Sequence, residues 1–71
     1  MEIMGDLKIG DILLDVDPNS REYKKYWNVI KKSTTATYIG VGDRILDFRH
    51  SVSIRELDFE LIDFNEEIWY W

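Results

Sequence analysis

The chain has 71 residues, a formal net charge of −5 and 45% hydrophobic residues, which predicts one small folded domain spanning residues 1–71. It contains no cysteine and a single histidine, His50, which excludes disulfides, thiolate metal sites and a histidine-based zinc site. No apolar run approaches the ~20 residues that a helix needs to cross a membrane. The acidic first residues do not resemble a signal peptide, so the expected location is a reducing cytoplasm.

The first third of the chain predicts one strand followed by an irregular loop. Residues 7–17 are rich in apolar side chains without helical spacing, and predict a strand with a turn or bulge at Gly10-Asp11. Pro18 then breaks the strand, and the polar residues around it are typical of a turn. The first half of segment 21–32 is compatible with a helical turn.

The middle of the chain predicts a three-stranded meander. Aromatic and β-branched residues predict strands at 26–32, 35–41 and 45–49. The pair Gly42-Asp43 between the last two of these strands is a hairpin signal.

Two shorter elements complete the predicted fold. Ser53 with Glu56 three residues later matches a capping box and predicts a helical turn at 53–57. Residues 58–64 alternate polar and apolar side chains and predict a last strand, with a slip in register near Leu61-Ile62. This order predicts a mostly β fold, a small five-stranded barrel of the Src-homology-3-like type. A compact mixed sheet with one helix at 19–27 is the alternative.

Charge is distributed unevenly along the chain. Residues 1–17 sum to −4, residues 18–55 to +5 and residues 56–71 to −6. The acidic C-terminal run could form a surface that mimics a phosphate backbone and binds a partner protein, or an ordinary solvated face. Its members are Glu56, Asp58, Glu60, Asp63, Glu66 and Glu67.

The chain ends in a strongly aromatic segment. Residues 65–71 form a candidate interaction tail that finishes with Trp69, Tyr70 and Trp71. Three adjacent large rings are expected either to close one end of the barrel or to contact a partner or a second copy of the chain. The sequence leaves both readings, and a homo-oligomer, open.

A basic segment interleaved with aromatic residues suits phosphate contact and base stacking, and is the candidate nucleic-acid site. The alternative is a solvated strand edge on which lysines discourage pairing. The candidate residues are Arg21, Lys24, Lys25, Tyr26, Trp27, Lys31 and Lys32.

Patterns for metal binding and catalysis are weak. Asp15, Asp17 and Asn19 have the spacing that begins a calcium loop, but Ser20 and Tyr26 stand where that loop needs Gly and Glu. This segment therefore predicts an acidic turn. His50 lacks the neighbours of a nucleophilic relay, and no glycine-rich phosphate loop is present. We predict no catalytic residue, metal or cofactor.

Part of the chain resembles a known group of proteins. Lys8-Ile9-Gly10-Asp11-Ile12 and the later run 26–35 are similar to small bacteriophage-encoded proteins that open with a Lys-x-Gly-Asp-Ile strand. The resemblance covers about residues 7–41 and implies a Src-homology-3-like barrel without catalytic residues. The acidic Asp15-Val16-Asp17 and the aromatic tail depart from it.

Together these features predict a non-enzymatic phage-type accessory protein. We expect it to bind and inhibit a host protein, such as a defence nuclease, in the cytoplasm of a bacterial cell. The alternative is a nucleic-acid or nucleotide binder that uses segment 21–32.

Overall fold

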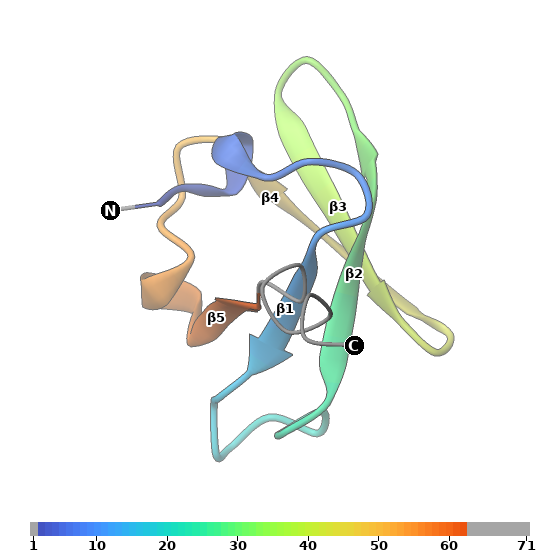
Figure 1. The fold of residues 1–71 in the computed structure, drawn as a ribbon, viewed down its shortest axis with the longest axis vertical. Helices are drawn as coiled ribbons and strands as arrows, with labels where there is room; N and C mark the ends of the chain where they lie inside the picture. Colours follow the sequence, from blue (N-terminus) through green and yellow to red (C-terminus); the bar gives the residue numbers. More distant parts are fainter. Residues whose placement is uncertain (1, 63–71) are drawn as a thin grey trace, which may run out of the picture.

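The computed structural model describes residues 2–62, which fold into one curved antiparallel sheet of five strands (Figure 1). The strand order across the sheet is β4-β3-β2-β1-β5. This confirms the predicted small, mostly β fold with five strands. The strands are β1 (Ile12–Asp15), β2 (Tyr26–Lys32), β3 (Ala36–Val41), β4 (Arg44–Arg49) and β5 (Phe59–Ile62), and two 3-10 turns accompany them, η1 (Met4–Asp6) and η2 (Arg55–Leu57).

The meander β2–β3–β4 follows its prediction to within one residue at each end. Its last hairpin turns at Gly42-Asp43, where Gly42 has a φ of 55°, a left-handed conformation that glycine adopts without steric cost. The hairpin register runs from Val41 opposite Arg44 to Ala36 opposite Arg49. The local turn signal therefore identified both strands.

The first strand is shorter than predicted. Residues 8–11 form a turn in which the Lys8 N–H donates to the Asp11 carboxylate at 2.8 Å, and Gly10 has a φ of 100°. The turn at Gly10-Asp11 is thus confirmed, but β1 covers Ile12–Asp15 only, not 7–17. The helix of the alternative fold is absent, because residues 21–24 are turns and β2 starts at Tyr26.

The irregular register lies in a different strand from the one predicted. Pairing of β1 with β5 is continuous from Ile12 opposite Ile62 to Asp15 opposite Phe59, so the expected slip near Leu61-Ile62 is wrong. The shift occurs in β2 between Val29 and Lys31, where a bulge inserts one extra residue.

The turn before β5 also differs in its cap. η2 begins at Arg55 and its N-cap residue is Ile54, with no side-chain capping hydrogen bond. The predicted capping box is therefore wrong, because the N-cap position falls one residue after Ser53, whose backbone pairs as an isolated bridge with Ile3. Ser53 thus pairs with Ile3, which is distant in the sequence, and the predicted local capping box with Glu56 does not form the start of η2.

The core lies inside the curve of the sheet. It contains Met4, Leu7, Leu13, Trp27, Val29, Ile39, Ile54 and Phe59. The ring of Phe59 lies 6.0 Å from that of Trp27 and 6.2 Å from that of Phe48, both edge to face. Side chains of β4 and β5 thus meet across the core, although these strands are at opposite ends of the sheet and do not pair within residues 2–62.

Within residues 2–62, no helix has the length and apolar character that a bilayer crossing requires.

Candidate functional site

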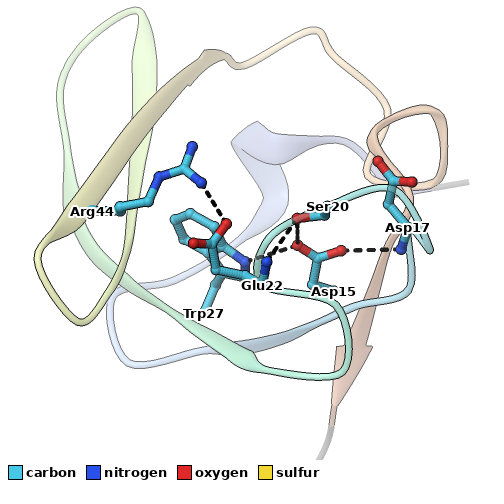
Figure 2. Close-up of polar contacts among 6 residues, drawn as sticks. All are labelled: Asp15, Asp17, Ser20, Glu22, Trp27 and Arg44. Carbon is cyan, nitrogen blue, oxygen red and sulfur yellow. Dashed lines mark hydrogen bonds and ion pairs between the residues drawn. The ribbon is translucent and has the colours of Figure 1, made fainter.

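A buried polar cluster holds the loop between β1 and β2, and Figure 2 shows its members. Asp15 is only 3% exposed, and its carboxylate accepts hydrogen bonds from Ser20 Oγ at 2.7 Å, Trp27 Nε1 at 3.3 Å and the Asp17 N–H at 3.0 Å. A buried carboxylate is stable only when such donors replace its water. The contacts fix the loop against the core.

A second pair in the same cluster links this loop to β4. Glu22, which is 7% exposed, accepts a hydrogen bond from Arg44 Nη1 at 2.5 Å (Figure 2). The Arg44 guanidinium also lies 5.9 Å from the centre of the Trp27 ring. A cavity of about 160 Å³ lies against these groups. Because its carboxylates are already engaged by protein donors, we interpret this cluster as structural.

The acidic turn at 15–19 is confirmed. The Asp17 carboxylate accepts from the Asn19 N–H at 2.9 Å, and the Ser20 N–H donates to the Asp17 carbonyl at 3.0 Å. These are the local bonds by which aspartate stabilises a turn. Among residues 2–62, no group of three or more His, Asp or Glu side chains is arranged to hold a metal ion.

The basic-aromatic segment does not form one continuous surface. Trp27 is 1% exposed in the core, so it has no ring face to offer an external base, and we remove it from the candidate nucleic-acid site. Lys32 is also removed, because its Nζ donates to the carbonyls of Gly5 and Leu7, each at 2.7 Å. The members that remain exposed are Arg21, Lys24, Lys25, Tyr26 and Lys31.

The reason for this division is the alternation of side chains along β2. Trp27 and Val29 point inward while Tyr26 and Asn28 point outward. The bulge after Val29 then leaves Lys31 opposite the half-buried Tyr38, with its Nζ 5.4 Å from that ring, and Lys32 opposite the buried Thr37. Lys31 and Lys32 are therefore neighbours in the sequence, but Lys31 is exposed and Lys32 binds the N-terminal segment.

The first three members of the acidic run lie together on the surface. Glu56, in η2, and Asp58 and Glu60 are all exposed. The predicted start of the last strand at Asp58 is wrong, because Asp58 has a φ of 57° and β5 begins at Phe59. The remaining acidic residues and the aromatic tail lie outside the described residues: Asp63, Glu66, Glu67, Trp69, Tyr70 and Trp71.

Two of these acids line a surface hollow beside β5. The hollow has a volume of about 470 Å³, and an apolar set and a charged set of side chains meet in it. The apolar set is Val16, Ile54, Phe59 and Leu61, and the charged set is Glu2, Arg55, Asp58 and Glu60. With three acids and one base, the hollow carries a net negative charge of 2. We call it the β5 hollow.

Sequence reasoning missed part of this site. Glu2 reaches the β5 hollow because the Ile54 N–H donates to the Glu2 carbonyl at 3.1 Å, which ties the start of the chain to η2. Residues more than 50 positions apart are brought together by this pairing, and no local pattern signals it. The acidic residues at both ends of the sequence were the available hint.

Comparison of the chain with protein-family models, curated proteins and solved structures gives no match. The class of protein defined here is thus a small antiparallel β protein with an acidic, partly apolar hollow at the end of its sheet.

Proposed function

We propose that this protein is a non-enzymatic binding module of the phage accessory type, which binds a basic surface of a host protein and inhibits it. The observation that carries the proposal is the β5 hollow, in which exposed carboxylates surround apolar side chains. Carboxylates steer a basic partner toward the surface and fix its orientation. The apolar floor supplies contact area that charge alone does not.

The partner class follows from charge complementarity. Enzymes that act on nucleic acids present lysine and arginine side chains to the phosphate backbone. An acidic surface on a small protein can occupy such a groove and exclude the substrate. A host nuclease is therefore the proposed target, in agreement with the resemblance to small bacteriophage proteins.

Direct nucleic-acid binding is less well supported. Of the seven residues in that candidate site, Trp27 belongs to the core and Lys32 holds the N-terminal segment. The five candidate residues that stay exposed belong to the basic middle of the chain, which acidic segments precede and follow in the sequence. We treat nucleic-acid binding as an outcome of the test below.

The test is affinity capture from bacterial lysate, run with and without nuclease treatment, with two matched double variants. Asp58→Asn with Glu60→Gln removes two charges from the β5 hollow, and asparagine tolerates the left-handed conformation at position 58. Asp43→Asn with Asp47→Asn removes two exposed charges from the hairpin of β3 and β4.

We expect the wild-type chain and the control variant to capture the same protein, and the β5 variant to lose at least about tenfold in affinity for it. Inhibition of the captured enzyme should fall in parallel. Equal capture by all three chains would contradict the proposed function, as would capture that vanishes on nuclease treatment.

A further inference from the structure

The strand β5 lies at one end of the sheet, and its hydrogen-bonding pattern can be read from the register. Asp15 N–H donates to the Lys25 carbonyl and Val29 N–H to the Asp11 carbonyl, so odd-numbered residues of β1 bond toward β2. Val16 N–H donates to the Asp58 carbonyl, so even-numbered residues bond toward β5. In an antiparallel pair these two directions alternate along each strand.

The same alternation assigns the two sides of β5. Glu60 and Ile62 bond toward β1, because they lie opposite the even-numbered residues Leu14 and Ile12. Asp58, just before β5, does the same through its carbonyl, which accepts from the Val16 N–H. The backbone groups of Phe59 and Leu61 therefore face away from β1. The Phe59 N–H donates to the Ile54 carbonyl at 3.2 Å. The Leu61 N–H and carbonyl have no backbone partner within residues 2–62.

This open edge borders the β5 hollow. Phe59, Glu60 and Leu61 all line the hollow, together with Asp58 just before the strand. An extended segment laid along the edge would meet the Leu61 backbone groups that no backbone group of residues 2–62 engages, apolar side chains of β5 and carboxylates of Asp58 and Glu60. Backbone pairing of this kind gives affinity, and the alternate side chains give specificity.

We propose that the partner docks by strand addition: an extended segment bearing lysine or arginine pairs with β5 through Leu61 and becomes a sixth strand. This inference deepens the proposed function and rests on it. The acidic residues select a basic segment, and the Leu61 N–H and carbonyl each form one hydrogen bond with its backbone.

The opposite edge of the sheet lacks this combination. The hollow beside β4 is lined by Thr35, Ala36, Asp47 and Arg49, so the charges of one acid and one base cancel and Ala36 is its one apolar residue among those described. A hollow without net charge gives no preference for a basic segment. Strand addition is therefore assigned to β5.

The test separates the backbone of Leu61 from its side chain. Leu61→Pro removes the N–H, which proline tolerates on the free side of an edge strand, and Leu61→Ala shortens the side chain but keeps the N–H. The probe is an acetylated peptide of three Lys-Val repeats, with three Glu-Val repeats as the charge control. Binding is measured by calorimetry, after thermal melting confirms that each variant is folded.

We expect the Lys-Val peptide to bind Leu61→Pro about tenfold more weakly than Leu61→Ala, the loss of about one backbone hydrogen bond. In the wild-type chain, the same peptide should slow hydrogen exchange at the Leu61 amide by at least about tenfold. This second measurement does not depend on the folding of the proline variant. The Glu-Val peptide should not bind.

Equal affinities of the two variants, an unchanged Leu61 exchange rate, or no binding of the Lys-Val peptide at millimolar concentration would each overturn strand addition. Host-protein capture that still depends on Asp58 and Glu60 would then leave the proposed function standing. Capture that is independent of these charges would remove the proposed function itself.

Discussion

At the scale of single residues, Asp15 anchors the loop that follows β1. Its carboxylate lies within an otherwise apolar strand and receives two side-chain donors and one backbone donor. Hydrogen bonds to a charged acceptor are stronger than neutral ones, and a donor left unpaired in the core costs its full desolvation. Asp15 therefore contributes to stability by accepting hydrogen bonds from donors that would otherwise lack a partner.

Replacing Asp15 with alanine should leave the buried Trp27 Nε1 donor and the Ser20 hydroxyl without their acceptor. We expect a loss of about 3 kcal/mol in the free energy of unfolding. Asp15→Asn, which keeps an acceptor oxygen, should lose about half as much. Urea unfolding measures both variants, and the slope of the transition should not change.

The exposed Asp47 provides the control for this measurement. Asp47→Ala should change the free energy of unfolding by less than about 0.5 kcal/mol. If Asp15→Ala were as mild as this control, the cluster would not hold the loop.

At the scale of elements, the N-terminal segment is attached to the sheet by a few polar contacts. Thr37 Oγ1 donates to the Met4 carbonyl at 2.9 Å, and Lys32 Nζ donates to the carbonyls of Gly5 and Leu7. Gly5 is required at this contact, since a Cβ there would lie 2.8 Å from the Cβ of His50. The buried side chain of Met4 completes the attachment.

Lys32→Met keeps the aliphatic part of the side chain but removes its ammonium group. We expect unfolding to become easier by about 1–2 kcal/mol, because two carbonyls lose their donor. Amide exchange of η1 should accelerate more than that of β3. Lys31→Met, at the exposed neighbouring position, should have an effect below about 0.5 kcal/mol. Equal effects of the two variants would contradict a structural role for Lys32.

The comparison of these two lysines shows where sequence reasoning succeeds and where it ends. The strands at 26–32, 36–41 and 44–49 follow from local β preference and the Gly42-Asp43 turn. The local pattern does not show which face of β2 is buried, and this places Trp27 inward with Val29. Nor does it mark the bulge between Val29 and Lys31, which places Lys32 opposite the buried Thr37. Trp27 and Lys32 were therefore assigned to a binding surface that they do not join.

The candidate site shows the same limit at long range. The acidic residues of segment 56–60 were identified from composition, because a run of carboxylates without bases is visible in the sequence. The hollow beside them depends on the contact of Glu2 with Ile54 and on the pairing of Ile3 with Ser53. The capping-box prediction failed beside this same contact, because η2 begins one residue later than predicted and its N-cap is Ile54.

At the scale of the whole molecule, the fold concentrates charge that is spread along the sequence. The pairing of β1 with β5, together with the Glu2–Ile54 hydrogen bond, brings Glu2, Asp58 and Glu60 to one end of the sheet. The basic middle of the chain supplies β2, β3 and β4 at the other end. This separation of charge gives the molecule a distinct acidic region around the β5 hollow.

The most direct test of this account is a hydrogen-exchange footprint of the chain in complex with the host protein that it captures. We predict slower exchange in residues 54–62, which contain most of the lining of the β5 hollow, and little change in residues 21–32. Protection of residues 21–32 with unchanged exchange in residues 54–62 would contradict the account and transfer the binding surface to the basic-aromatic segment.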